Sequence, residues 1–442
     1  MIAEKLLYYA MEAGLEQAEV YQSLTHSIRF NIMDQKVHEF TVSDKTGVSL
    51  RGTYDGRCAG AYTEKTDDRE LKALAQRCHD LACFLETEDT VLFTRGEKAM
   101  VDDRSDDHLS SLAIEDKIAY MKKLEKTVLA LDPRVKRVSR CAYQEVVSEN
   151  ILNNTLGLDG DRKSSLGLIT LSVIASNGQE QVNSFGWRII KDLDEKSLKD
   201  LAQEVAEEAT GKLGAVRIPS AKMPVILRED AASDLVGSLW SMFSAEQIRK
   251  ELSVMKGKLN QQVMSPLITI VDDPQMKDGV CSCDFDDEGV PTQKTVIVEK
   301  GVFLHPLYDR KNALKEDKKS TGNGFKNGCS APVQISPTNL IVKNGEKSLE
   351  EMIASIEEGV LITDVEGLHA GLNPLTTDFS LQASGYKIEK GKKAYPVHLI
   401  TIAANYIEMM NHITALGNDG RQGLDGVCCP SIQIDSLAVS GE

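Results

Sequence analysis

The sequence predicts an α+β fold: a duplicated α-β(3)-α region at the N-terminal end, followed by a mostly antiparallel, all-β, barrel-like C-terminal domain. The first observation is an internal repeat, because residues 70–76 read ELKALAQ and residues 197–203 read SLKDLAQ. The second is a change of pattern after residue 214, where short strand-like runs alternate with glycine and asparagine turns. The same order of predicted elements around both copies of the heptapeptide indicates a duplicated supersecondary unit. Many short strands with turn residues indicate a barrel or sandwich.

Each copy of the repeat is predicted to begin with a helix, continue with strands and end with a second helix. Residues 2–13 and 112–131 show apolar residues at helical spacing. The closing helices follow Asp67 and Asp194, a residue type that accepts hydrogen bonds from a helix N-terminus. The strand-like runs between these helices are 19–32, 37–42, 47–54 and 57–62 in the first copy, and 135–145, 147–153, 166–175 and 180–188 in the second.

A polar connection at residues 96–108 separates the two copies, so we predict domains at residues 1–105, 106–220 and 221–442. The third domain opens with a predicted helix near residues 229–256. Strand-like runs dominate the rest of it. These runs are 266–271, 295–299, 302–307, 338–342, 359–363, 378–384, 385–389, 396–402 and 431–439, with short helices at 349–358 and 406–413.

The totals favour a soluble globular protein and exclude several classes of function. The chain has 51 Lys and Arg against 67 Asp and Glu, a formal charge of −16, and such a surface repels phosphate backbones and anionic lipids. No apolar run reaches the roughly 20 residues that span a bilayer, and the start of the chain lacks the features of a secretion signal. The nine cysteines include no Cys-x-x-Cys pair, which favours free thiols in a reducing compartment. We therefore expect a cytoplasmic protein without direct nucleic-acid or membrane contact.

Five sequence blocks of the last third of the chain occur in a fixed order. They are DFDDEGVPTQKTVIVEKGVF (284–303), KSTGNG (319–324), GLNPLTTDFSLQASGY (371–386), PVHLITIAAN (396–405) and ITALGND (413–419). In this order the blocks resemble the TldD/PmbA family, whose members were once called modulators of DNA gyrase. The resemblance implies an α+β N-terminal region with an internal repeat, a closed β-barrel C-terminal domain and membership of a cytosolic peptidase system.

The family that the chain resembles has two branches. The TldD branch carries His-Glu-x-x-x-His on the helix that opens the last domain, with a C-terminal cysteine as third zinc ligand. The PmbA/TldE branch lacks the histidines and pairs with TldD as a heterodimer. In this chain the two ligand positions fall near Val236 and Ser241, and all eight histidines lie elsewhere. Valine cannot bind zinc, and Cys428, at the place of the family's cysteine, supplies one ligand where about three are required.

The resemblance therefore implies a PmbA/TldE-like chain with no metal and no catalytic residue of its own, and zinc in a TldD-like partner. It also implies a substrate cleft lined by small and polar residues of three blocks. The candidates are Ser320, Thr321, Gly322, Asn323, Asn373, Thr376, Asp378, Asn418 and Asp419. For the last five, hydrogen bonding to nearby backbone in turns is the alternative.

The acidic run at residues 284–288 imitates the first half of a calcium-binding loop. Such a loop requires a carboxylate at its twelfth position, where this chain has Thr295. We therefore expect a solvated turn at this place.

These observations predict a non-catalytic subunit of a TldD/TldE-type metallopeptidase complex that takes part in proteolysis of unfolded peptides. Two alternatives remain open. One is a homodimer that binds peptides or a protein without hydrolysis, for which any link to DNA gyrase would be indirect. The other is a peptidase with a non-standard metal or thiol site.

Overall fold

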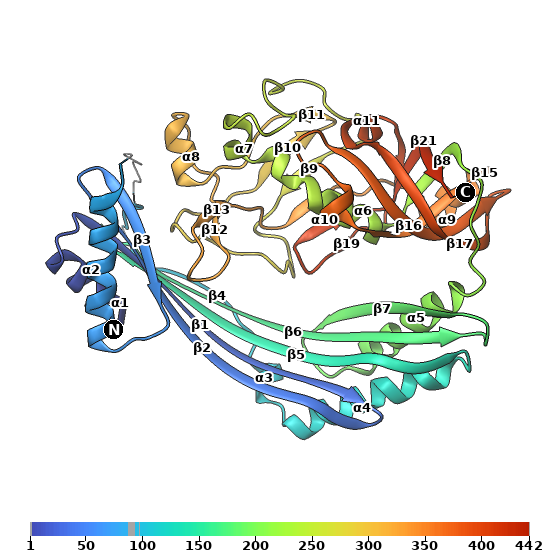
Figure 1. Cartoon of the computed structure of the whole chain (residues 1–442), viewed down its shortest axis with the longest axis horizontal. Helices are drawn as coiled ribbons and strands as arrows, with labels where there is room; N and C mark the ends of the chain where they lie inside the picture. Colours follow the sequence, from blue (N-terminus) through green and yellow to red (C-terminus); the bar gives the residue numbers. More distant parts are fainter. Residues whose placement is uncertain (1, 87–92, 97, 442) are drawn as a thin grey trace. The chain divides into compact units, whose positions relative to one another are not determined.

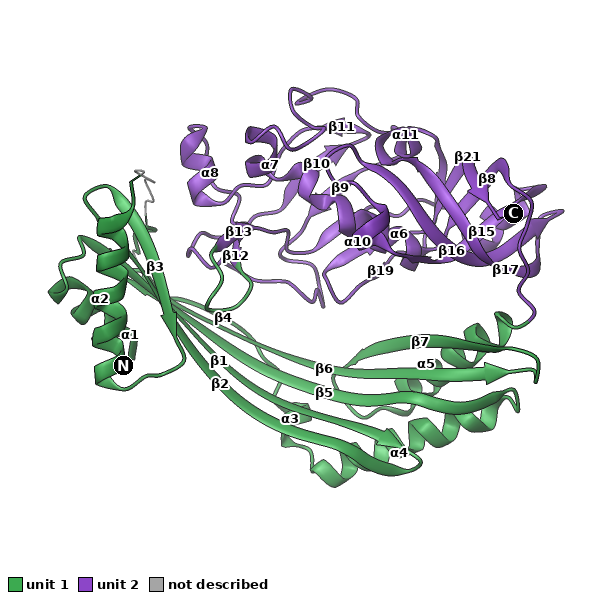
Figure 2. Ribbon diagram, in the orientation of Figure 1, with its two compact units in different colours: residues 1–213, 326–332 green, residues 214–325, 333–442 purple. Residues whose placement is uncertain are grey.

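The computed structural model describes residues 2–86, 93–96 and 98–441 (Figure 1). The chain divides into two compact units, which Figure 2 distinguishes by colour. Unit 1 comprises residues up to 213 together with 326–332, and unit 2 comprises residues 214–325 and 333–442. Helices and mostly antiparallel sheets occur in the order that the sequence predicts, so the α+β fold class is confirmed. Among the described residues, no helix has the length and apolar composition that crossing a bilayer needs.

Unit 1 is built on one sheet of seven strands, in the order β3-β2-β1-β5-β6-β4, with β7 also paired to β6. Its strands are β1 (Gln17–Met33), β2 (Lys36–Tyr54), β3 (Arg57–Thr63), β4 (Met100–Arg104), β5 (Val135–Asn154), β6 (Asp159–Ser176) and β7 (Gln181–Ile190). The predicted break between runs 37–42 and 47–54 is wrong, and so is the break in the middle of β5. The polar residues of β2 continue to pair with β1, as in Ser27 with Ser43, so a loss of apolar alternation does not end the strand.

The helices of unit 1 are α1 (Ile2–Glu12), α2 (Asp68–Phe84), α3 (His108–Ser111), α4 (Ile114–Leu131) and α5 (Glu195–Gly211). The two copies of the repeat begin their closing helices in the same way. The Asp67 carboxylate accepts a hydrogen bond from Glu70 N (3.1 Å), and the Asp194 carboxylate accepts one from Ser197 N (2.7 Å). Glu70 and Ser197 are the first residues of the repeated heptapeptide. In both copies the heptapeptide therefore follows an aspartate N-cap at the same distance.

Each copy has its own hydrophobic core, and the long strand β1 contributes to both. Ala18 and Val20 pack with α1 and α2, whereas Phe30 and Ile32 pack with α4 and α5. Figure 1 accordingly shows α1 and α2 near one end of the long strands and α4 and α5 near the other. The duplication thus places two helix pairs on one continuous sheet.

Unit 2 contains a closed barrel of five strands in the order β17-β16-β15-β8-β21, which β17 completes by pairing with β21. The strands are β8 (Ala221–Leu227), β15 (Glu358–Glu366), β16 (Asp378–Glu389), β17 (Lys392–Asn405) and β21 (Ile432–Ser440). Only the β8–β15 pair within this ring is parallel. The barrel that the sequence predicts is therefore confirmed, and its ring leaves none of these five strands with a fully open edge.

A second sheet of unit 2 has the order β11-β10-β9-β14-β20-β19. Its strands are β9 (Ile270–Asp272), β10 (Thr295–Glu299), β11 (Val302–Phe303), β14 (Leu340–Val342), β19 (Arg421–Gln422) and β20 (Val427–Cys429). Unit 2 also contains β13 (Val333–Ile335), β18 (Ile413–Leu416), α8 (Arg310–Lys315), α9 (Leu349–Ala354), α10 (Leu368–Gly371) and α11 (Tyr406–Asn411). The short strand β12 (Gly324–Lys326) begins in unit 2, and its last residue belongs to unit 1. Strands of two to four residues contain too few positions to show alternation, which explains why several were not predicted.

The predicted continuous helix near residues 229–256 is wrong. The chain forms α6 (Glu229–Leu239), a 3₁₀ turn η1 (Trp240–Phe243) and α7 (Ala245–Arg249). The reason is a pairing distant in sequence: Leu307 N donates to Phe243 O (2.9 Å) and Leu307 O accepts from Ala245 N (3.0 Å). These bonds hold Ser244 extended and interrupt the helix. The apolar residues of the segment, including Leu239, Met242 and Phe243, are nevertheless buried in the core.

Candidate functional site

Helix α6 is the element on which the related family's zinc motif would lie. Val236 is 3% exposed and packs in the core of unit 2, and Ser241 lies beyond the end of α6, in η1. The two positions are therefore not on one continuous α-helix. An isopropyl group cannot bind zinc and a lone hydroxyl is a poor ligand, so these residues do not fit the metal. In the part of the chain that the structure describes, no group of three or more His, Cys, Asp and Glu side chains is arranged to hold a metal ion.

Gly237 follows Val236, where the motif would place its glutamate. A Cβ atom on Gly237 would lie 3.0 Å from Asp425 Oδ2 and 3.3 Å from a side-chain carbon of Val427. One turn earlier on the helix, Ser233 Oγ accepts a hydrogen bond from Cys429 N (3.2 Å). This face of α6 therefore packs closely on β20, and a carboxylate from the turn before β20 lies beside the position of the missing glutamate.

Glu229, at the start of α6, has a pKa near neutrality. Burial, followed by repulsion from Asp230, raises the pKa of Glu229 to about 7, while Arg228 and Arg421 act in the opposite direction. A carboxyl group that titrates near neutral pH can exchange a proton under physiological conditions.

Asp234, further along α6, is a second perturbed carboxyl group. Partial burial, followed by the charges of Asp230, Asp425 and Asp364, raises the pKa of Asp234 to about 6. The residue as a whole remains exposed, so solvent screens these charges. We therefore regard Glu229 as the better probe of this helix.

We expect replacement of Glu229 by Gln to change how stability depends on pH. The pKa of Glu229 in the folded protein, about 7, exceeds its ordinary value of 4.5, so the folded chain binds this proton more tightly than the unfolded chain. The natural protein therefore loses stability as the pH rises through this range, whereas the Gln variant has no proton to lose. We compare the free energy of unfolding of the variant with that of the natural protein at each pH. The difference, variant minus natural protein, should be more positive at about pH 8 than at about pH 5.

Urea unfolding at the two pH values measures this difference. Glu350→Gln, which changes an exposed glutamate of α9, is the matched control and should show the same effect at both pH values. If the effects of the Glu229 and Glu350 substitutions on stability depended on pH in the same way, the raised pKa of Glu229 would be contradicted.

Cys428 lies on β20, between β14 and β19, where it is paired with Ile341 and Gln422. Its neighbours Val427 and Cys429 belong to the core that includes α6. Because successive side chains of a strand point to opposite faces, Cys428 points away from α6. Burial raises the pKa of its thiol. The structure thus directs Cys428 away from the Val236 position.

The glycine-rich loop before β12 carries four of the predicted cleft residues. Asn323 is buried; its Nδ2 donates to Asp272 Oδ2 (2.7 Å), and its Oδ1 accepts from Thr321 Oγ (2.6 Å). Ser320 Oγ donates to Tyr308 O (3.0 Å). Burial raises the pKa of Asp272 to about 6, although its hydrogen bonds act in the opposite direction. These side chains make hydrogen bonds inside unit 2.

The fourth residue of this loop, Gly322, has a positive φ of 73°. A Cβ atom there would lie 2.6 Å from Pro291 O, and one on Gly324 would lie 2.6 Å from Glu288 Oε2. Gly324 N also donates to Asp286 Oδ2 (2.8 Å). These glycines therefore allow the backbone of the loop to lie close to the acidic turn at residues 286–291.

The expectation of a solvated acidic turn is wrong. Asp286, Asp287 and Glu288 are at most 4% exposed. Asp286 Oδ1 accepts hydrogen bonds from Glu288 N and Val290 N, both at 2.9 Å, so backbone donors compensate for the loss of water. Burial, followed by the charge of Glu288, still raises the pKa of Asp286 well above its usual value. A turn of acidic residues can be buried when its own backbone satisfies the carboxylates.

Asn373 and Thr376 lie in the turn that precedes β16, Asp378 is the first residue of β16, and all three residues are exposed. Asn373 Oδ1 accepts from Leu375 N (3.0 Å). Asp378 Oδ1 accepts from Asn405 Nδ2 (2.9 Å). Hydrogen bonds from Asn405 and then from Thr376 lower the pKa of Asp378. These contacts stabilise the turn before β16 and link the first residue of β16 to Asn405, the last residue of β17.

Asn418 and Asp419 lie after β18. The Asp419 carboxylate accepts hydrogen bonds from Ser431 N (2.9 Å) and Ser431 Oγ (2.7 Å), and Asn418 O accepts one from Asn344 Nδ2 (3.1 Å). The nine candidates therefore occupy three places: the loop before β12, the turn before β16 together with the first residue of that strand, and the turn after β18. Their assignment to a substrate cleft stays a prediction.

Sequence reasoning did not single out Asp272 or Asp425. Asp272 is fixed by Asn323 and by Thr338, whose N and Oγ both donate to Asp272 Oδ1 at 2.7 Å. Its partners are more than 50 residues away in the sequence, so no local pattern marks it. Asp425 lies beside Gly237 only because β20 packs on α6. The one hint in the sequence was Gly237, because a glycine has no side chain and so leaves room for the carboxylate of Asp425.

The fold is that of an α+β protein with a long N-terminal sheet that carries two helix pairs and a closed C-terminal barrel. Three family models match successive parts of the chain: PmbA/TldA metallopeptidase domain 1 at residues 18–82, the central domain at 107–213 and the C-terminal domain at 220–441. The last match covers half of the chain. The chain therefore belongs to the PmbA/TldA metallopeptidase family.

Relatives and solved structures span the whole chain. An uncharacterized protein of Methanocaldococcus jannaschii is 29% identical over 427 residues, covering 96% of both chains. The metalloprotease PmbA of Escherichia coli O157:H7 is 22% identical, covering 99% of this chain and 97% of the relative. A crystal structure from Thermotoga maritima, described as a candidate modulator of a DNA gyrase, has a TM-score of 0.89 at 30% identity over 99% of both chains. TldE from Thermococcus kodakarensis, at 22% identity over 99% of both chains and a TM-score of 0.90, shares the fold.

Proposed function

We propose that this chain is a non-catalytic, PmbA/TldE-like subunit of a TldD/TldE-type metallopeptidase complex that acts in proteolysis of unfolded peptides. The proposal rests on the residues of α6 and η1 that stand at the expected positions of the zinc motif. Val236 is buried in the core, Gly237 faces Asp425, and Ser241 lies past the helix end, in an otherwise complete family fold. A zinc peptidase needs about three protein ligands and an open position for water, so the zinc and the activated water belong to a TldD-like partner.

The chain has relatives among both TldD-type and PmbA-type proteins, which supports the proposed partnership. A metalloprotease TldD homologue from Haemophilus influenzae is 26% identical over 97% of this chain, and PmbA proteins match at similar identity. Two subunits of one ancestry can present equivalent surfaces to each other, which favours a pseudosymmetric pair.

An open strand edge in unit 1 supports binding of an extended peptide. The first part of β2 pairs with β1, whereas β3 begins to pair with β2 only at Val48. Val37, Phe40 and Val42 on this part of β2 are exposed. An extended peptide that adds a strand to such an edge is held mainly through its main chain, which suits broad selectivity for unfolded peptides.

The cellular context that we propose is the cytoplasm, without direct contact to nucleic acid or membrane. The formal charge of −16 and nine free cysteines support this location.

Mixing the purified chain with a TldD-like protein that carries His-Glu-x-x-x-His tests the proposal. We expect light scattering to show a complex of the two chains, and we expect the mixture to cleave a denatured protein faster than the TldD-like protein alone. A TldD-like variant with both motif histidines replaced by Ala is the control, which should form the complex without cleavage. Two separate masses and an unchanged rate would contradict the proposal and favour the homodimeric binding protein.

A further inference from the structure

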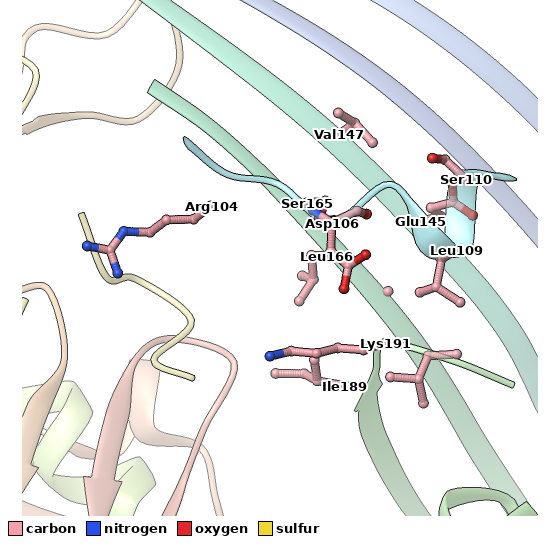
Figure 3. A pocket seen from close by; sticks show the side chains of 12 residues that line it. Arg104, Asp106, Leu109, Ser110, Glu145, Val147, Ser165, Leu166, Ile189 and Lys191 are labelled. Carbon is pink, nitrogen blue, oxygen red and sulfur yellow. Dashed lines mark hydrogen bonds between the residues drawn. The ribbon is translucent and has the colours of Figure 1, made fainter. Parts of the chain in front are cut away.

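A pocket of unit 1 has a volume of about 110 Å³ and lies between β5, β6, the end of β7 and the segment from the end of β4 through α3 (Figure 3). Its charged side chains, such as Glu145 and Arg104, already have partners in unit 1. Glu145 accepts hydrogen bonds from Lys117 Nζ (2.6 Å) and Tyr143 Oη (2.8 Å), and Arg104 Nε donates to Asp102 Oδ1 (2.8 Å). The edge of β2 differs from this pocket, because it has main-chain groups with no strand beside them.

The open edge of unit 1 is the part of β2 from Lys36 to Gly47. On one side, this part pairs with β1 along its whole length. On the other side, β3 begins to pair with β2 only at Val48, and no other described strand pairs with residues 36–47. The outward N–H and C=O groups of such an edge are available to a further strand.

A row of stacked aromatic rings crosses the sheet and ends at this open edge. Tyr143 on β5, Phe30 on β1 and Phe40 on β2 lie directly opposite one another in the strand register. The ring of Phe30 lies 5.1 Å from the ring of Tyr143 and 6.2 Å from the ring of Phe40, with interplanar angles of 17° and 19°. Tyr143 and Phe30 are fully buried, whereas Phe40 is 48% exposed. Within the described chain, the row therefore stops at a half-exposed ring on the open edge.

A strand that adds to the open edge continues this row. Side chains directly opposite each other on neighbouring strands are in contact, and aromatic pairs are among the most favourable of these contacts. Val42 points to the same face of the strand as Phe40 and is also exposed. The position opposite Phe40 therefore favours an aromatic side chain.

Glu39 adds a charge preference on the opposite face of the strand. Its side chain is exposed and has no ionic or hydrogen-bonding partner among the described residues. Of the other charged groups on the open edge, Asp44 pairs with His26 (2.7 Å), and Lys36 and Lys45 lie toward the two ends. A cation directly opposite an unpaired carboxylate is favourable, and the formal charge of −16 also attracts basic peptides.

We propose that the open edge of β2 selects extended peptides in which an aromatic residue is followed directly by a basic residue. The peptide pairs antiparallel to β2, as β1 and β3 do, so its aromatic ring lies against Phe40 and its next residue faces Glu39. Phe40 and Glu39 are then the residues that determine specificity. This inference rests on the strand-edge binding in the proposed function and names the class of peptide that the edge takes.

Fluorescence anisotropy of a labelled peptide, titrated with the full chain alone, tests the proposal. The peptide is built of Thr and Ser, with Phe-Lys at its centre. We expect saturable binding, and about fivefold weaker binding when Ser replaces the Phe. The reversed order, Lys-Phe, places the lysine opposite Thr41 and should also bind more weakly. Of two copies that are N-methylated at alternate residues, only the copy that keeps its N–H groups toward β2 should bind.

Each comparison has a result that overturns part or all of the proposal. Absence of saturable binding of the Phe-Lys peptide would overturn all of it. Equal affinity for the Ser-Lys peptide would overturn the role of Phe40, and equal affinity for the Lys-Phe peptide would overturn the role of Glu39. Equal binding of the two N-methylated copies would overturn strand addition.

These titrations do not depend on a TldD-like partner. A peptide preference without a complex would contradict the proposed subunit role and support this inference. A complex without a peptide preference would support the subunit role and overturn this inference.

Three variants locate the site on β2. Phe40→Ser should remove the preference for Phe-Lys over Ser-Lys. Tyr62→Ser, which changes an exposed aromatic residue of β3, is the matched control and should keep this preference. If Phe40→Ser does not fold, Glu39→Lys decides, since Glu39 is exposed. That variant should bind Phe-Glu more tightly than Phe-Lys, and an unchanged preference for Phe-Lys would overturn the proposal.

Discussion

Replacing Lys117 by Met is expected to destabilise the folded chain by about 3–5 kcal/mol. Lys117 on α4 is buried, and its Nζ lies 2.6 Å from the Oε2 of buried Glu145 on β5. Met fills a similar volume but leaves the Glu145 carboxylate without its counter-ion inside unit 1. Tyr143 alone then donates to that carboxylate, which does not compensate a buried charge. The free energy of unfolding, measured by urea titration, should fall by this amount.

A second substitution separates the lost charge pair from lost packing. Removing both charges, in Lys117→Met with Glu145→Leu, should recover most of the stability, because two apolar side chains can replace a buried ion pair at little cost. Lys126→Met changes an exposed lysine of the same helix and should stay within about 0.5 kcal/mol of the natural protein. The account of this pair is wrong if Lys117→Met costs no more than Lys126→Met.

Asp286→Ala is expected to have a similarly large effect in unit 2, at least about 3 kcal/mol. The carboxylate accepts hydrogen bonds from the backbone N–H groups of Glu288, Val290 and Gly324, at 2.8–2.9 Å. Ala removes the acceptor of all three donors, two of which belong to the buried residues Glu288 and Gly324. It also removes the link between the acidic turn and the glycine-rich loop.

The adjacent carboxylate provides the control for this experiment. Asp284 is exposed, and its side chain accepts a hydrogen bond from Gln275 Nε2 (3.0 Å). Asp284→Ala should therefore cost less than about 1 kcal/mol. Chemical unfolding of both variants distinguishes a buried, structural turn from the solvated turn that the sequence suggests. Equal small effects would favour the solvated turn.

The sequence was sufficient to predict those elements whose structure depends only on neighbouring residues. The caps Asp67 and Asp194 begin their helices as predicted, since an N-cap needs only the next few residues. The barrel strands β16 and β17 follow from alternation and turn residues. The predicted runs 378–384 and 385–389 form one strand, β16, so the break between them is wrong, and β17 is longer than the run 396–402 that predicts it.

Contacts between distant segments account for what sequence reasoning missed. The predicted helix is interrupted at Ser244 because Leu307 pairs with the backbone on both sides of that residue. The acidic turn is buried because Gly324, from the glycine-rich loop, donates to Asp286. No pattern within either segment encodes such a contact. The sequence places the expected ligand positions near Val236 and Ser241, which stays a prediction, and it gave no sign that the end of α6 separates these two residues.

The most direct test of the proposed non-catalytic role is metal analysis of the isolated chain, with a peptidase assay before and after chelation. The chain without a partner should contain far less than one zinc per molecule and should show no chelator-sensitive cleavage of unfolded peptides. One zinc per chain together with cleavage that a chelator abolishes would show that this polypeptide is a metallopeptidase by itself, and the account of α6 would then be wrong.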